Sequence, residues 1–153
     1  DLKYAWKNGA GPWQFAIIEA RGVTGAYTSL GLDNSGNPYV SYWNQGAGDL
    51  KYAEKIGASP WAATVVDTPG DMGMFNSIAV SGSGNPRISY RDQTHGNLKY
   101  AWRNGAGPWQ KIVVDSAGNV GEFTSVALNN LGQPAISYFD RTNGDLKYAW
   151  FTP

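Results

Sequence analysis

The chain has 153 residues, of which 42% are hydrophobic and 16% charged, so it holds enough apolar material for one folded domain and too little charge for a disordered tail. Twelve basic residues balance twelve acidic residues and occur singly, which excludes the basic stripe that nucleic acids and anionic membranes attract. The chain has no Cys, so disulfides, thiolate metal sites and Cys nucleophiles are excluded as well.

The sequence repeats itself with a period of 48 residues. The segment Asp-Leu-Lys-Tyr-Ala-Trp or a close variant stands, without insertion or deletion, at residues 1–6, 49–54, 97–102 and 145–150. A fixed period of this kind outranks local propensity as evidence for a fold. We therefore predict three units and one additional strand, at residues 1–48, 49–96, 97–144 and 145–153.

Each unit divides into four short strands separated by turn-forming residues. The clearest copy opens with alternating strand formers at residues 27–32, and the Asp-Asn-Ser-Gly-Asn-Pro segment after them is typical of a turn. Its other strands are expected at residues 39–43, 50–54 and 61–66, and Pro69 begins the crossing to the next unit. No segment shows a sustained apolar period of 3.6 residues, so no helix is predicted.

Four antiparallel strands in about 40–50 residues, repeated along a chain, are typical of the blades of a β-propeller. One blade cannot bury both faces of its sheet, so adjacent blades stack and aromatic side chains fill the space between them. The sequence thus predicts an all-β fold, a β-propeller of four-stranded antiparallel blades with three blades in the chain. The aromatic residues expected to pack between blades are Trp13, Trp61, Trp109, Tyr42, Tyr90 and Tyr138.

Two segments carry a resemblance to known families. Residues 30–40, with apolar alternation, an Asp, a Gly-Asn turn and a second apolar strand, resemble the inner hairpin of NHL-type propeller repeats. Residues 5–13, Ala-Trp-Lys-Asn-Gly-Ala-Gly-Pro-Trp, are similar to the outer hairpin of short-repeat propeller lectins that bind fucose. The first resemblance implies a propeller, and the second implies a carbohydrate ligand.

Three blades are fewer than the 4–8 with which propellers close. Two chains related by a twofold axis would give six blades, so one expected partner is a second copy in a homodimer. The third strand would then be offered twice, by residues 1–9 and 145–153. The alternative is that the chain is an excerpt of a longer polypeptide that supplies the other blades, and the sequence leaves both open.

Several residues with chemical potential have simpler interpretations. His95 is the only histidine and lies in a turn, so it lacks a second His for a ligand pair, and no metal and no cofactor are expected. The acids Glu19, Asp67 and Asp115 recur at the end of the outer strand, one per unit. A glycosidase needs two carboxyl groups on one substrate, so we interpret these acids as turn formers.

The informative positions are those where the scaffold recurs and the side chain changes. After the recurring Tyr of the second strand the three units differ, and loops on a rigid scaffold are where binding residues concentrate. The predicted ligand-binding residues are Trp43, Arg91, Asp92, Phe139 and Asp140. We expect Arg91→Ala to abolish glycan binding with little change in melting temperature. The other interpretation of these positions is unconstrained variation of the surface.

These observations favour a non-catalytic module that binds or scaffolds, with carbohydrate as the leading ligand class. The alternative is a structural or protein-interaction propeller, including a designed or excised fragment without a ligand. An enzyme is not expected, and neither is a nucleic-acid partner. A membrane is not expected either, because no apolar run approaches the ~20 residues of a transmembrane helix. An extracellular location is expected, and the absence of Cys also fits a cytoplasmic one.

Overall fold

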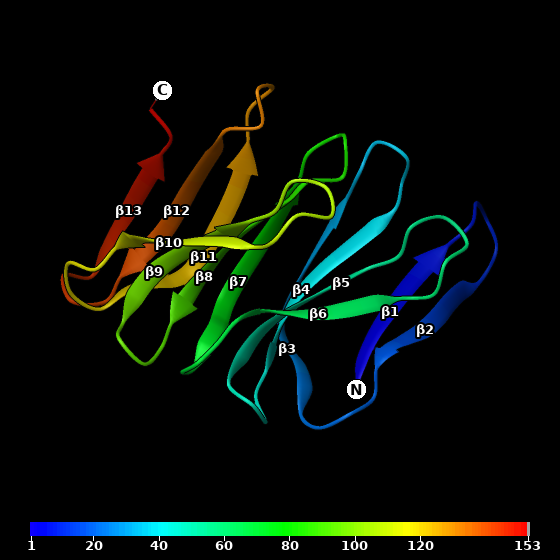
Figure 1. The fold of residues 1–153 in the computed structure, drawn as a ribbon, viewed down its shortest axis with the longest axis horizontal. Coiled ribbons are helices and arrows are strands. Elements are labelled where there is room, and N and C mark those ends of the chain that lie inside the picture. Colours follow the sequence, from blue (N-terminus) through cyan, green and yellow to red (C-terminus); the bar gives the residue numbers. More distant parts are fainter. Residues whose placement is uncertain (153) are drawn as a thin grey trace.

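The computed structural model describes residues 1–152, which form 13 strands in four antiparallel sheets (Figure 1). Within this range there is no helix, and hence none that could cross a membrane. The all-β class predicted from the sequence is confirmed. The strands are β1 (Leu2–Lys7), β2 (Trp13–Glu19), β3 (Thr24–Leu32), β4 (Pro38–Asn44), β5 (Asp49–Glu54), β6 (Ala62–Asp67), β7 (Met72–Val80), β8 (Pro86–Asp92), β9 (Asn97–Trp102), β10 (Gln110–Asp115), β11 (Val120–Leu128), β12 (Pro134–Asp140) and β13 (Asp145–Trp150).

Two of the sheets have four strands each, and in both the strands follow chain order. These sheets are β3-β4-β5-β6 and β7-β8-β9-β10. The other two are smaller: β1 pairs with β2, and β11, β12 and β13 form a three-stranded sheet. The strand predicted at residues 61–66 lies at Ala62–Asp67, and the strand predicted to begin at residue 27 begins at Thr24.

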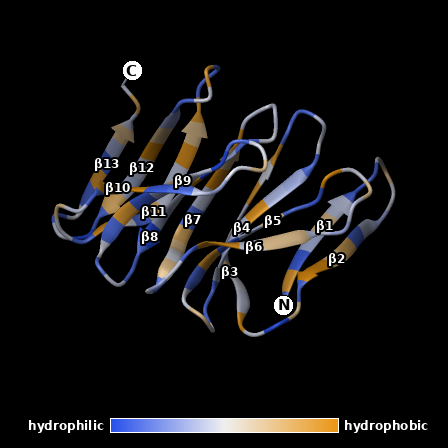
Figure 2. Ribbon diagram, in the orientation of Figure 1, coloured by the Kyte–Doolittle hydropathy of each residue, from blue (hydrophilic) through white to orange (hydrophobic). Residues whose placement is uncertain are grey.

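The hydrophobic core lies between neighbouring sheets. One cluster joins Tyr39 and Tyr52 of the β3–β6 sheet to Ile88 and Tyr90 of the β7–β10 sheet, and each of these side chains is at most 3% exposed. Figure 2 shows that strands such as β6 and β7 carry hydrophobic segments. Burial of this much apolar and aromatic surface is the main force that holds one sheet against the next.

The inner strands β3, β7 and β11 lie side by side and make the most extensive contacts between sheets. Gly73 in β7 has a φ of +104°, and a Cβ there would lie 2.9 Å from the Cα of Leu50 in the preceding sheet. Any larger residue would push the two sheets apart, which explains why the repeat keeps Gly at this position.

The recurring tryptophans pack between sheets where a preceding sheet is present. Trp61 contacts Tyr4 with ring centroids 5.3 Å apart, and Trp109 contacts Tyr52 at 5.1 Å, both edge-on. The predicted packing role is therefore confirmed for these two. For Trp13 it is wrong within residues 1–152: the side chain is 61% exposed, because no sheet precedes β1 in this range.

Candidate ligand-binding surface

The variable positions of the repeat lie opposite one another on the first two strands of each sheet. Trp43 pairs with Ala26, Arg91 with Met74, and Phe139 with Glu122. These pairs bring together the end of the second strand and the start of the inner strand. The sequence predicted that this edge of each sheet is shared, and the strand register agrees.

Arg91 is buried and is held entirely by the protein itself. Its side chain is only 3% exposed, and it donates hydrogen bonds to the Val120 carbonyl (2.8 Å), to Gln93 Oε1 (2.6 Å) and to the side-chain oxygen of Asn119. Glu122 lies 3.9 Å away and balances its charge. This geometry favours a structural role, in which Arg91 joins its own sheet to the β11–β13 sheet.

The two predicted aspartates are turn-forming residues in the structure. Asp92 is 3% exposed and accepts hydrogen bonds from the backbone N–H of His95 (3.0 Å) and from its ring nitrogen (2.9 Å). Asp140 is 2% exposed, and hydrogen bonds from the Asn143 side chain and from the Asn143 and Thr142 backbone hold its pKa below the ordinary value. Asp and Asn commonly stabilise turns in this way.

Trp43 is also buried, at 7% exposed, and Phe139 is half-buried. The predicted site residues thus share one edge of the sheets, but four of the five are covered by the protein. Their role in binding stays a prediction.

Among the described residues, no three His, Asp or Glu side chains are grouped as a metal would require.

Three aromatic residues that the sequence analysis did not single out form a continuous row across the inner strands. Tyr27, Phe75 and Phe123 occupy one position of the repeat, and their ring centroids are 4.8 and 4.7 Å apart. Trp43 lies 5.9 Å from Tyr27, and Phe139 lies 6.5 Å from Phe123. We call Tyr27, Phe75 and Phe123 the aromatic row.

The backbone of the aromatic row is strained. Its three residues have φ values of +51°, +52° and +51°, in the left-handed region that bulky side chains rarely adopt. Each lies where the ladder between the inner strand and its neighbour is irregular, as in a β-bulge. Such a conformation costs on the order of 1–3 kcal/mol and persists only where the surroundings impose it.

Buried hydrogen bonds impose this conformation. The Asn76 side chain donates to the carbonyl of Tyr27 (2.5 Å) and to that of Gly73 (2.8 Å), and it accepts a bond from the Ser41 hydroxyl (2.5 Å). In the next sheet Thr124 donates to the hydroxyl of Ser89 at 2.8 Å. Asn76 therefore fixes the backbone carbonyls of Gly73 and Tyr27, and Thr124 ties its strand to the preceding sheet. The recurrence of an aromatic followed by Thr or Asn was the sequence signal for this feature.

The recurring acids link sheets, so their interpretation as turn formers is incomplete. Asp67 in β6 accepts hydrogen bonds from Tyr90 (2.7 Å) and Lys99 (2.5 Å), which belong to the next sheet. The same arrangement joins Glu19 to Tyr42 and Lys51, and Asp115 to Tyr138 and Lys147. Each acid is engaged by its own Tyr and Lys in a different interface.

These links predict a loss of stability in acid. Burial raises the pKa of Asp67, but hydrogen bonds from Lys99 and Tyr90 outweigh it and hold the pKa below the ordinary value. A lowered pKa in the folded state stabilises the protein above the ordinary Asp pKa of ~3.9, and this contribution disappears as the pH falls through the folded pKa. Asp67→Asn should therefore lower the urea midpoint at pH 7 and lower it much less near pH ~2.

Asp145→Asn is the control for this comparison, because Asp145 is exposed and its replacement should leave the urea midpoint at pH 7 nearly unchanged. The prediction would be contradicted if Asp67→Asn lowered the urea midpoint by the same amount at both pH values.

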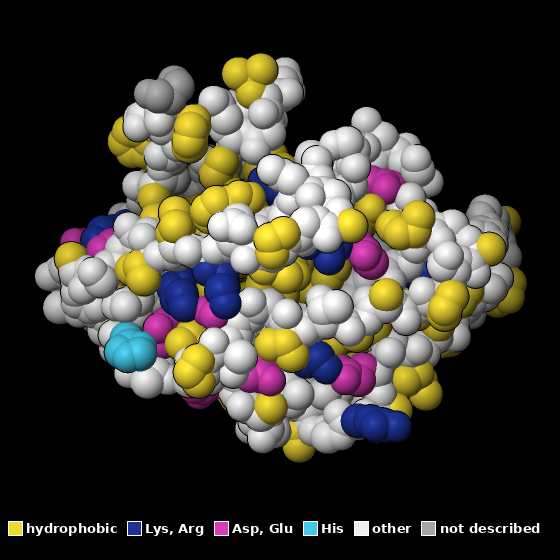
Figure 3. Space-filling model, in the orientation of Figure 1, with side chains coloured by type: hydrophobic (Ala, Val, Ile, Leu, Met, Phe, Trp, Pro, Cys, Tyr) yellow, Lys and Arg dark blue, Asp and Glu magenta, His cyan; other side chains and the backbone are white. Residues whose placement is uncertain are grey.

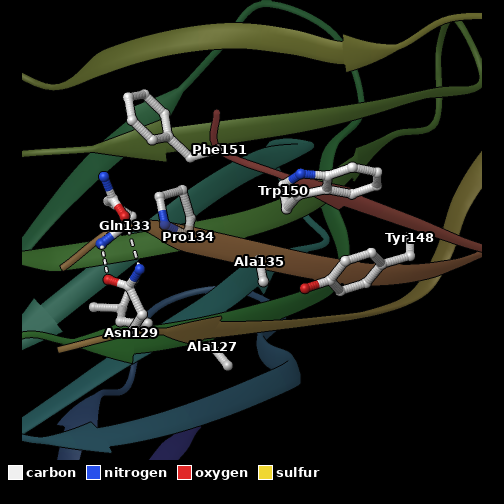
Figure 4. Close-up of a pocket in the computed structure, with 9 residues that line it drawn as sticks. Ala127, Asn129, Gln133, Pro134, Ala135, Tyr148, Trp150 and Phe151 are labelled. Atoms are coloured by element: carbon white, nitrogen blue, oxygen red, sulfur yellow. Dashed lines mark hydrogen bonds between the residues drawn. The ribbon is translucent and has the colours of Figure 1, made fainter. Parts of the chain in front are cut away.

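Two open grooves flank the last sheet. The first, of about 720 Å³, is lined by Tyr148, Trp150 and Phe151 beside the amide side chains of Asn129 and Gln133 (Figure 4). The second, of about 460 Å³, lies between the last two sheets and includes Tyr100 and Trp150. In the first complete sheet the position equivalent to Tyr148 is covered by the neighbouring sheet. The first groove is thus a sheet face without a neighbour, and the second lies where the three-stranded β11–β13 sheet has no fourth strand.

Comparison with known proteins yields a likeness of fold. No family model and no curated protein sequence matches the chain. Among solved structures, a fucose lectin from Kordia zhangzhouensis in complex with methyl-fucoside superposes with a TM-score of 0.53 at 15% sequence identity. The match covers 81% of this chain and 91% of the lectin. It supports a lectin-like all-β fold, and it does not show the expected similarity to NHL-type repeats.

Proposed function

We propose that this chain is a non-catalytic, lectin-like module that binds carbohydrate through the aromatic row, built as a β-propeller of four-stranded blades. The fold likeness to a fucose lectin supports the ligand class. A deoxy sugar such as fucose presents apolar C–H groups, which pack on aromatic faces, together with hydroxyls that need hydrogen-bond partners.

The observation that carries the proposal is the strained conformation of an exposed aromatic residue. Phe123 has a φ of +51° and is nevertheless 69% exposed. Burial of its own ring therefore repays little of the backbone strain. Strain that packing does not repay is characteristic of positions kept for binding or catalysis.

Polar groups suited to sugar hydroxyls lie beside this ring. Glu122 precedes Phe123, and its carboxylate accepts a hydrogen bond from Arg141 at 3.0 Å. The Arg141 side chain is 64% exposed, so part of its guanidinium is free to donate to a ligand. The phenol of Tyr27 adds a further donor at the other end of the row. Rings flanked by a few oriented polar groups are typical of ligand sites.

The test is a glycan array that includes α-fucosides, followed by titration of any hit against Phe123→Gly. We expect saturable binding by the parent protein and at least about a fivefold loss of affinity in the variant, because stacking contributes ~1 kcal/mol or more. Glycine adopts positive φ without strain, so the melting temperature of Phe123→Gly should not fall.

Leu131→Ala is the matched control, because Leu131 is an exposed apolar residue (81%) outside the aromatic row. This variant should bind as the parent does. Full binding by Phe123→Gly would place the site elsewhere. The absence of saturable binding to any glycan would favour the second candidate, a propeller that acts as a structural or protein-interaction scaffold, for which the exposed apolar faces at β2 and β13 are the supporting observation.

The proposal extends to assembly. The grooves beside β13 and the exposed Trp13 are surfaces that further copies of the repeat would cover. Those copies come either from a second chain, which would complete six blades, or from further repeats in the same polypeptide. A closed ring of blades would join the aromatic row end to end.

A further inference from the structure

Large apolar side chains are exposed at both ends of the row of sheets, at positions that are buried in its middle. Leu30 in β3 is 52% exposed, whereas the equivalent Ile78 and Val126 are 6% and 7% exposed. Leu146 in β13 is 81% exposed, whereas the equivalent Leu50 is fully buried. Figure 3 shows hydrophobic side chains at the surface over β12 and β13. These are faces that a neighbouring sheet covers wherever one is present.

The contacts between inner strands follow a fixed offset along the chain. Ser29 Oγ accepts the backbone N–H of Ile78 at 3.0 Å, and Ser77 Oγ accepts that of Val126 at 3.2 Å. Both bonds join residues 49 positions apart. The next member of the series has Ser125 as acceptor, and its donor is the residue equivalent to Leu30 in a following unit. Within residues 1–152 that donor is absent, and the backbone N–H of Leu30 in a second copy is the equivalent group.

The aromatic contacts between outer strands follow a rule of their own. The ring of each repeating Tyr in the third strand receives the edge of a Trp 57 residues later, as in the Tyr4–Trp61 and Tyr52–Trp109 contacts. The same rule applied to Tyr100 requires the residue equivalent to Trp13.

Tyr100 borders the groove of about 460 Å³ between the last two sheets, and that groove also contains Trp102 and Trp150. Trp13 is 61% exposed at the opposite end of the chain. The chain therefore has a groove beside Tyr100 without its Trp at one end and an exposed Trp13 at the other end.

We propose that the β11–β13 face binds the β2–β3 face of a second copy of this chain, with the partner's Trp13 seated against Tyr100 and the partner's Leu32 against Ala127. This proposal names the partner and the register of the assembly. It rests on the part of the proposed function that concerns assembly. The internal interfaces define the fit, because the pair equivalent to Ala127 and Leu32 is Gly31 and Val80. A Cβ on Gly31 would lie 3.6 Å from the Cβ of Val80.

The joint sheet formed in this way has one position for a third strand and two identical candidates. Residues 1–6 and 145–150 have the same sequence. The first segment forms β1, which pairs with β2, and the second forms β13, which pairs with β12. Either strand can lie between β12 and the partner's β2, and the other is then released from the sheet.

Disulfide trapping tests this register, since the chain contains no Cys of its own. The variant Leu32→Cys/Ala127→Cys is oxidised and run on a non-reducing gel. Disulfides need a Cβ–Cβ separation of about 3.5–4.5 Å, which the internal pair meets. Gly31→Cys/Val80→Cys is the positive control and should form a bond within one chain. Leu32→Cys/Leu131→Cys is the negative control, because residue 131 lies in a turn outside the predicted contact.

We expect the Leu32→Cys/Ala127→Cys protein to become a covalent dimer of twice 16.5 kDa or a ladder of larger species, with at least half of the chains linked. Either product supports the interface, and a dimer that retains no free thiol also indicates a closed ring, because both cysteine pairs are then joined. Adding Trp13→Ala should reduce the cross-linked fraction several-fold. If the internal control oxidises fully while this protein stays monomeric, the proposal is wrong. No sugar is present, so the outcome is independent of carbohydrate binding.

Discussion

Replacement of Trp109 by Ala should lower the free energy of unfolding by about 3 kcal/mol, near the lower end of the range for large buried aromatics. The indole packs edge-on against Tyr52 with ring centroids 5.1 Å apart, and the guanidinium of Arg103 lies 5.3 Å from its ring. Removing the ring would leave a cavity between the β3–β6 and β7–β10 sheets and expose Tyr52. Urea unfolding followed by far-ultraviolet circular dichroism measures the change.

Trp109→Phe is the matched control, because it keeps a ring in the same interface and should cost less than about 1.5 kcal/mol. A loss below about 1 kcal/mol for Trp109→Ala would show that the indole is not packed in solution. Its face would then be available to a ligand, and the outer hairpins would replace the aromatic row as the leading binding surface.

Arg91→Ala should destabilise the protein by about 2–4 kcal/mol, because it removes a buried charge with three hydrogen-bonded partners. The carbonyl of Val120 and the side chain of Asn119 would lose their donor, and Glu122 would lose one of its two arginine neighbours. The sequence analysis expected an almost unchanged melting temperature, whereas the burial of Arg91 predicts a large decrease. The measurement is the same urea titration.

Arg141→Ala separates the effect of burial from the effect of charge. Arg141 bonds to the same carboxylate of Glu122, but its side chain is 64% exposed, so its removal should cost less than about 1 kcal/mol. Equal losses from the two variants would contradict the structural role assigned to Arg91. Loss of sugar binding in Arg91→Ala would follow from loss of the fold, and Phe123→Gly is therefore the informative binding variant.

The order of strands could be predicted because it depends on local patterns that recur. Gly and Pro mark the turns, alternating apolar residues mark the strands, and the period of 48 residues fixes where each unit begins. The packing role of Trp61 and Trp109 followed from the same recurrence, since every interface between sheets needs the same large side chain.

The candidate site could not be predicted to the same degree, because it depends on contacts between units. A variable position such as residue 91 is exposed or buried according to which loop of the next sheet covers it. The left-handed backbone of Phe123 has no counterpart in amino-acid propensity, because bulky residues disfavour it. Lys99 donates a hydrogen bond to Asp67 across 32 residues of sequence, and only the folded interface shows that a strand-end acid links two sheets.

A chain whose sheets contact mainly their sequence neighbours gains stability step by step along its length, much as a solenoid does. The β7–β10 sheet has a neighbour on both faces, whereas the β11–β13 sheet has only one. In a single chain without a partner, slow amide hydrogen exchange should therefore be found in the middle and local opening at the ends. Phe123 lies in the β11–β13 sheet, at the end that opens. A ligand that binds Phe123 should therefore also stabilise this sheet, and the cost of ordering the sheet should lower the observed affinity.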